Sequence, residues 1–90
     1  MTIKDVKVGV MVAAAQALDY KKAKSNSDIE EIMRHVIANI DANTEARRGV
    51  VAGATRAVSY RDQNPSMSDK EIMQRIMDEV NDIATSLEEE

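Results

Sequence analysis

Residues 68–87, SDKEIMQRIMDEVNDIATSL, decide the fold class because their apolar side chains recur at helical spacing. The apolar side consists of Ile72, Met73, Ile76, Met77, Val80, Ile83, Ala84 and Leu87. Ser68 and Glu71 have the spacing of a capping box, a pair of side chains that marks the start of a helix. The stretch therefore predicts an amphipathic helix over about 69–86.

The same pattern occurs earlier in the chain, in residues 27–40, SDIEEIMRHVIANI. Ser27 and Glu30 have capping-box spacing. The apolar stripe that follows consists of Ile29, Ile32, Met33, Val36, Ile37 and Ile40. These residues predict a helix over about 28–41. Between the two helices, residues 62–66, DQNPS, hold the single proline and predict a loop.

Two further helices complete the expected set, over about 3–24 and 44–61. Thr2 and Asp5 resemble a cap at the start of the first, and Lys21, Lys22 and Lys24 suit its negative end. Residues 41–43 offer caps for the helix over 44–61. We expect a break there, although a nearly continuous helix from 28 to 61 is the alternative.

The two halves of the chain align with an offset of 40 residues. The matches include Gly9 with Gly49, Ala14 with Ala54, Tyr20 with Tyr60, and Glu31-Ile32-Met33 with Glu71-Ile72-Met73. We predict an all-α, four-helix bundle-like domain over residues 1–90, from a tandem duplication of a helix–loop–helix unit. Its pseudo-repeats are 3–42 and 43–87, and residues 88–90 form an acidic tail. About a pseudo-twofold axis, the first helix would pair with the third and the second with the fourth.

Small residues dominate the expected contact between the first and third helices. They are Ala13, Ala14 and Ala17 on one side and Gly53, Ala54 and Ala57 on the other. A glycine inside a helix costs about 1 kcal/mol relative to alanine. Close approach of the two backbones is a physical reason for Gly53.

The first helix is apolar nearly all the way round. Between Val8 and Leu18 the single polar side chain is Gln16. One interpretation is that this helix is enclosed at the centre of an irregular bundle. The other is an interface for self-association or for another protein, formed by Val8, Met11, Val12 and Ala15.

The side-chain inventory disfavours ordinary catalysis. The chain has no cysteine, one histidine and three isolated glycines, so no thiol chemistry, Ser–His–acid arrangement or phosphate-binding glycine loop is indicated. His35 follows Glu31 by one helical turn, but Arg75 takes its place in the second half, so we interpret it as a surface residue and expect no metal site. We expect no cofactor and no enzymatic activity.

Charge alternates along the chain, whose net charge is −4. Residues 1–24 and 44–61 are basic, whereas 25–43 and 62–90 are acidic. Neighbouring helices of opposite charge explain this pattern. The alternative is that Lys4, Lys22, Arg48 and Arg56 form a face that contacts nucleic acid. Against it, the chain lacks Phe and Trp for base stacking and is acidic overall.

The sequence therefore favours a non-enzymatic helical protein that acts through an apolar helix surface. Its expected partner is a second copy, in a dimer or larger homo-oligomer, or another protein. An accessory regulator that contacts nucleic acid is the alternative. With no secretory signal and no apolar stretch of about 20 residues, we expect a cytoplasmic protein with no membrane partner.

Overall fold

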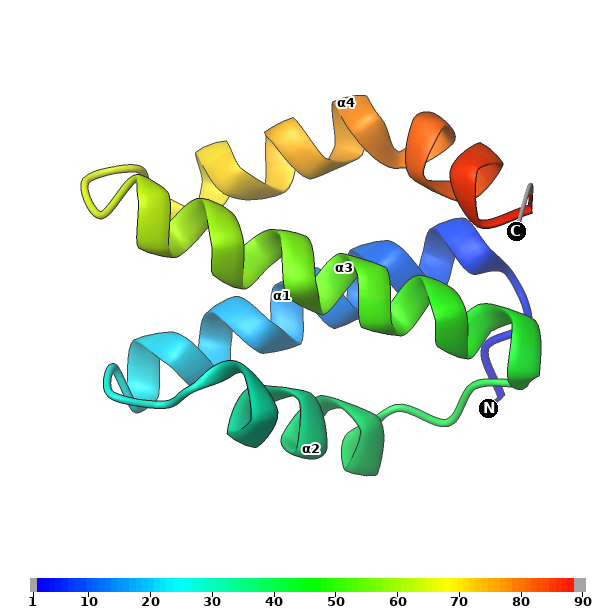
Figure 1. The fold of residues 1–90 in the computed structure, drawn as a ribbon, viewed down its shortest axis with the longest axis horizontal. Helices are drawn as coiled ribbons and strands as arrows, with labels where there is room; N and C mark the ends of the chain where they lie inside the picture. The colour runs from blue at the N-terminus through cyan, green and yellow to red at the C-terminus, as the bar shows by residue number, and fades with distance from the viewer. Residues whose placement is uncertain (1, 89–90) are drawn as a thin grey trace.

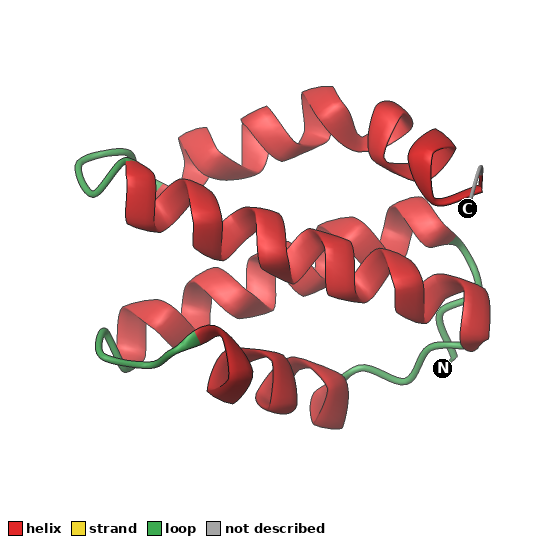
Figure 2. Cartoon of the chain, viewed as in Figure 1, coloured by secondary structure: helices red, strands yellow, loops and turns green. Residues whose placement is uncertain are grey.

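The computed structural model describes residues 2–88 as four helices joined by short loops (Figures 1 and 2). They are α1 (Val6–Ala23), α2 (Ile29–Asn39), α3 (Thr44–Gln63) and α4 (Asp69–Glu88). The all-α, bundle-like fold is as the sequence predicts. Of the expected acidic tail, Glu88 belongs to α4, and residues 89–90 lie outside the part described.

Polar side chains begin each helix, and two of them differ from the expected caps. The Asp5 carboxylate accepts from the Lys7 and Val8 N–H groups, so α1 begins at Val6 rather than near residue 3. The Asp28 carboxylate accepts from the Glu31 N–H and displaces Ser27 as the cap of α2. In both helices a carboxylate occupies the cap position in place of the expected hydroxyl. Ser, Thr and Asp are all favoured at this position, so the residue types alone do not distinguish between the two candidates.

The other two helix starts match the sequence prediction. The Asn43 amide oxygen accepts from the Ala46 N–H at 2.8 Å at the start of α3. The Ser68 hydroxyl accepts from the Glu71 N–H at 3.1 Å at the start of α4. Residues 40–43 separate α2 from α3, so the expected break is present.

Residues 2–4 form no helix because their backbone is paired with the α2–α3 connection. The Ile3 N–H donates to the Asp41 carbonyl at 2.7 Å, and the Asn43 N–H donates to the Ile3 carbonyl at 2.9 Å. Ile3 and Ala42 thus make an isolated parallel β-bridge. The bridge attaches the N-terminal segment to the junction between the two halves.

Helices α1 and α3 run in the same direction and cross at the centre, and α2 and α4 flank them on opposite sides (Figure 1). Each flanking helix packs against both central helices, and α2 does not pack against α4. The expected pairing of the first and third helices is therefore confirmed. The expected pairing of the second with the fourth is wrong, because the central pair lies between them.

The central helices approach so closely that a methyl group would not fit at several positions. A Cβ on Gly53 would stand 2.1 Å from the Val10 carbonyl oxygen, and one on Gly9 would stand 2.7 Å from the Ala46 carbonyl oxygen. Real Cβ atoms essentially never approach this closely. Close backbone approach is thus the reason for Gly53, as the sequence suggested.

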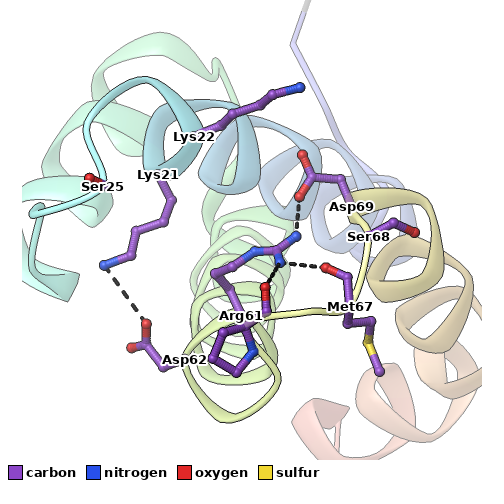
Figure 3. Close-up of a pocket in the computed structure, with 9 residues that line it drawn as sticks. Lys21, Lys22, Ser25, Arg61, Asp62, Met67, Ser68 and Asp69 are labelled. Carbon is purple, nitrogen blue, oxygen red and sulfur yellow. Dashed lines mark hydrogen bonds and ion pairs between the residues drawn. The ribbon is translucent and has the colours of Figure 1, made fainter.

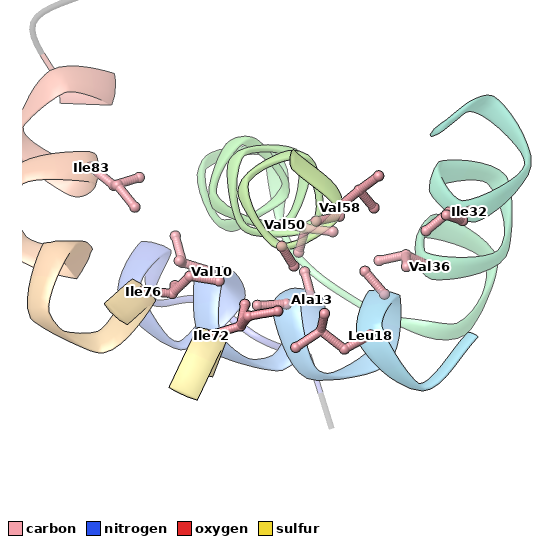
Figure 4. Packing of buried hydrophobic residues seen from close by; sticks show 14 of the residues in the cluster. Val10, Ala13, Leu18, Ile32, Val36, Val50, Val58, Ile72, Ile76 and Ile83 are labelled. Carbon is pink, nitrogen blue, oxygen red and sulfur yellow. The ribbon is translucent and has the colours of Figure 1, made fainter. Parts of the chain in front are cut away.

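The core fills the spaces beside this tight crossing with aliphatic side chains (Figure 4). Ile72 and Ile76 of α4 pack on one side, and Ile32 and Val36 of α2 pack on the other. Val10 and Val50 from the central pair are fully buried. Each flanking helix therefore depends on the central pair for the burial of its apolar stripe.

Several contacts recur 40 residues apart in the two halves. The Lys24 N–H donates to the Tyr20 carbonyl at 2.8 Å, and the Asn64 N–H donates to the Tyr60 carbonyl at 2.9 Å. The His35 ring lies 4.4 Å from the Tyr20 ring, between centroids. In the second half, the Arg75 guanidinium lies 5.4 Å from the Tyr60 ring. These equivalences agree with a duplication, which stays a prediction.

Candidate functional site

The outer side of α1 is an apolar strip formed by Val8, Met11, Val12 and Ala15. Val8 is 48% exposed, and the other three are partly exposed. The opposite side of α1 is buried, including Val10. Helix α1 is therefore central in the bundle but is not enclosed on every side. The interpretation of the strip as an interface stays a prediction.

Other apolar side chains reach the surface on all three remaining helices. Met77 of α4 is the most exposed of the large apolar residues described, at 54%. Ile29 and Ile37 of α2 and Val51 of α3 are also exposed. The sequence placed Ile29, Ile37 and Met77 on core-facing stripes. The flanking helices bury only the middle of each stripe against the central pair, which leaves these residues at its edges.

The four basic residues considered for nucleic-acid binding are not brought together. Lys4 precedes α1 and Lys22 lies in its last turn, and the helix from Val6 to Lys22 alone is about 24 Å long at 1.5 Å per residue. Arg56 forms an ion pair with Glu79 at 2.9 Å. Arg48 lines a cleft with two acids, Glu45 and Glu88. The structure thus places acids among these bases and spreads the bases along the molecule.

A cleft of about 660 Å³ lies where the α1–α2 and α3–α4 loops meet, and we call it the loop cleft (Figure 3). Its charged lining comprises Lys21, Lys22 and Arg61 together with Asp62 and Asp69. Cavities of this size can hold a small molecule. This cleft was not predictable from the sequence, because it forms only when two loops distant in the chain come together.

Arg61 holds the α3–α4 loop in place. Its guanidinium donates to the Met67 carbonyl and to the Asp69 carboxylate, and it reaches the Pro65 carbonyl at 3.4 Å (Figure 3). Lys21 does the same in the first half, where its ammonium donates to the Ser27 carbonyl at 2.8 Å. These contacts fix the walls of the loop cleft.

Each tyrosine hydroxyl donates to a carboxylate that projects from a flanking helix. The Tyr20 hydroxyl and the Ser27 hydroxyl both donate to Glu31, and these hydrogen bonds lower the pKa of the Glu31 carboxyl. The Tyr60 hydroxyl donates to Glu79, and burial together with this hydrogen bond raises the pKa of Tyr60. Each pair connects a central helix to a flanking one.

His35 lies in a second cleft, between α1 and α2, with Gln16, Asp19 and Asn39. Its ring nitrogen Nδ1 is 3.3 Å from the Asn39 amide nitrogen, and Asn39 also donates to the His35 carbonyl at 2.7 Å. His35 is partly buried against Tyr20 rather than freely solvated. Among residues 2–88, no group of three or more His, Cys, Asp or Glu side chains could hold a metal ion.

Comparison with protein-family models, with curated proteins and with solved structures finds no match for this chain. In the described part of the chain, none of the helices combines the length and the apolar character needed to cross a membrane.

Proposed function

We propose that this is a non-enzymatic helical protein that acts by association, through the apolar strip on α1 and with a second copy of itself as the first partner. The supporting observation is the exposure of Val8, which is 48%, next to the partly exposed Met11, Val12 and Ala15. Met11 also packs against the core, whereas Val8, Val12 and Ala15 are not among the residues of the core cluster. Contiguous apolar surface of this kind is typical of interfaces.

A second copy fits the strip because the strip is nearly free of charge. Gln16 is the single polar side chain between Val8 and Leu18. A twofold contact places the same patch of each copy against the other, so an uncharged apolar strip can face itself without charge repulsion.

The test is the particle mass in solution, measured by light scattering over a range of protein and salt concentrations. We expect a dimer that persists at high salt, since burial of apolar surface is not screened. Val8→Asp and Val12→Asp should return the protein to a folded monomer. Val51→Asp is the matched control, because Val51 is a helical valine of similar exposure, 41%, outside the strip.

Two results would contradict the proposal. One is a wild-type monomer at every concentration. The other is an equal loss of mass in Val8→Asp and Val51→Asp, which would place the contact elsewhere. Circular dichroism of each variant checks that the helices remain.

The nucleic-acid alternative has less support. Arg56 already pairs with Glu79, and Lys4 and Lys22 lie at opposite ends of α1. Binding to phosphates releases counterions and weakens steeply with added salt. Binding of duplex or single-stranded DNA at low salt, lost at moderate salt and on Lys22→Glu, would favour this alternative over apolar association.

A further inference from the structure

The two halves of the chain, α1 with α2 and α3 with α4, depend on each other for the burial of their apolar side chains. The most extensive contact between two helices is that of α1 with α3, and it joins the halves. The contacts within a half, of α1 with α2 and of α3 with α4, are much smaller. Most of the core therefore lies between the halves, so the partner that each half needs is the other half.

One short connection, residues 40–43, leads from the first half to the second. Its sequence is Ile-Asp-Ala-Asn, which contains neither glycine nor proline. These two residue types are the ones that most strongly disfavour a helix, so the connection is able to become helical. The loop between α3 and α4 differs in this respect, because it contains Pro65. Residues 29–63 can therefore form one continuous helix, whereas a continuous helix through α3 and α4 is disfavoured.

The connection is kept bent by hydrogen bonds near both of its ends. At its second end, the Asn43 side chain accepts from the Ala46 N–H at 2.8 Å and caps α3. Near its first end, the Asp41 carbonyl accepts from the Ile3 N–H at 2.7 Å. In a continuous helix, the Ala46 N–H would donate to the Ala42 carbonyl four residues earlier, and Ile3 would be released. The cap and the pairing with Ile3 thus stabilise the bent form alone.

We propose that the chain forms a dimer by domain swapping, in which the connection straightens and the first half of one copy packs against the second half of another. A continuous helix over residues 29–63 would be about 52 Å long, whereas the longest extent of the folded chain is 32 Å. In that state α3 extends away from α1, so the two can no longer cross within one chain. A second copy in the same state supplies the missing half, and the contact of Gly53 with Val10 forms between chains.

The balance between the closed monomer and the swapped dimer depends on the connection and on protein concentration. The core contacts are the same in both forms, so their free energies cancel. The monomer keeps the Asn43 cap and the Ile3 pairing, and the dimer gains helical hydrogen bonds across residues 40–43. Because association costs freedom of motion, the dimer forms at high protein concentration. It makes no use of the apolar strip on α1 and does not depend on the association proposed above.

The test is to unfold the full chain in urea, refold it at low and at high protein concentration, and separate monomer from dimer by gel filtration. Every protein carries Val8→Asp, which removes the strip as a route to association. Asn43→Ala destabilises the monomer but not the continuous helix, so it should favour the dimer about fivefold per chain. Ser68→Ala is the matched control. It removes the cap of α4, whose connection to α3 contains Pro65, so it should leave the dimer fraction unchanged.

A second variant tests the other end of the connection while the cap of α3 stays in place. The Asp41 carboxylate accepts from the Thr2 hydroxyl at 2.7 Å, so Asp41→Ala frees the connection from the N-terminal segment. It should raise the dimer fraction as Asn43→Ala does. Circular dichroism of each variant checks that the helices remain.

Refolding a mixture of isotope-labelled and unlabelled copies shows whether the halves have been exchanged. A Cβ on Gly9 would stand 3.5 Å from the Val50 Cγ2, so the two residues are neighbours across the α1–α3 contact. In the swapped dimer, an isotope-filtered NOE should connect Gly9 of one chain to Val50 of the other. A dimer without this NOE would overturn the proposal. So would monomer alone at every concentration in both connection variants, or an equal dimer fraction in Asn43→Ala and Ser68→Ala.

Discussion

Gly53 of α3 lies directly against the backbone of Val10 of α1, and a Cβ on Gly53 would stand 2.1 Å from the Val10 carbonyl oxygen. The Val10 carbonyl oxygen belongs to the backbone of a central helix, so it cannot move away by a rotation about a side-chain bond. The close spacing of the central helices therefore depends on glycine at this position, as it does at Gly9 and Gly49.

Gly53→Ala should destabilise the protein, by about 1–3 kcal/mol, because the helices must separate to admit the methyl group. The sign is informative, since alanine in place of glycine at an unobstructed helix position stabilises by about 1 kcal/mol. Gly53→Leu should have the larger effect. Urea unfolding followed by circular dichroism measures both. A Gly53→Ala variant as stable as the wild type would mean that the helices do not approach so closely.

Arg61→Ala should lower the free energy of unfolding by about 2 kcal/mol, since a partly buried cation with a carboxylate and carbonyl partners is lost. Lys70→Ala is the control, because Lys70 is exposed and has no partner among residues 2–88. Its effect should stay within about 0.5 kcal/mol. Equal effects of the two substitutions would show that the α3–α4 loop is not fixed by Arg61.

The helices were predictable because each carries a strong local signal. Ser68 and Glu71 begin α4, and the period of its apolar residues extends through to Leu87. The start of α1 was misplaced because Ile3 is held by Asp41, a residue distant in the chain. The separation of α2 from α4 was also not predictable from the sequence. Both flanking helices carry similar apolar stripes, and only the packing of the whole domain decides which side of the central pair each stripe covers.

The candidate surfaces were predictable to a lesser degree. The strip around Val8 was predictable because Gln16 is the single polar side chain between Val8 and Leu18, a pattern that is visible in the sequence alone. The exposure of Met77 was not predictable, since its spacing is that of a core residue. The loop cleft was missed for another reason. In the sequence, Lys21 is one of three cations that suit the end of the first helix, and only the tertiary fold brings it to the same cleft as Arg61.

Tyr20→Phe should destabilise the protein more at neutral pH than in acid. The Tyr20 and Ser27 hydroxyls donate to Glu31 and lower the pKa of its carboxyl below 4.5. A carboxyl with a lowered pKa stabilises the fold above its unfolded value, and this stability is lost as the pH falls through the folded value. The cost of removing the Tyr20 hydroxyl should therefore shrink between about pH 7 and about pH 3.

Urea unfolding of the wild type and Tyr20→Phe at the two pH values measures this difference. Subtracting the two proteins at each pH removes the contribution of the carboxylates that do not contact Tyr20. A penalty that is the same at both pH values would show that the hydroxyl does not interact with an ionised Glu31. Ser27→Ala should show the same trend, because the Ser27 hydroxyl lies 3.1 Å from the same carboxylate oxygen.

Tyr60 should ionise above the ordinary tyrosine value of 10.0, because burial and the hydrogen bond to Glu79 both favour its neutral form. Its contribution to stability is then fully present below pH 10.0 and is lost as the pH rises through the folded pKa. The chain has two tyrosines, so in Tyr20→Phe the absorbance of the phenolate reports Tyr60 alone.

Two further substitutions in the Tyr20→Phe background should move the midpoint of the Tyr60 titration in opposite directions. Glu79→Gln removes the negative charge and should lower the pKa of Tyr60, whereas Arg56→Ala removes the cation that favours the phenolate and should raise it. A midpoint that moves the same way in both variants would indicate a general loosening of the α3–α4 contact in place of these specific charges.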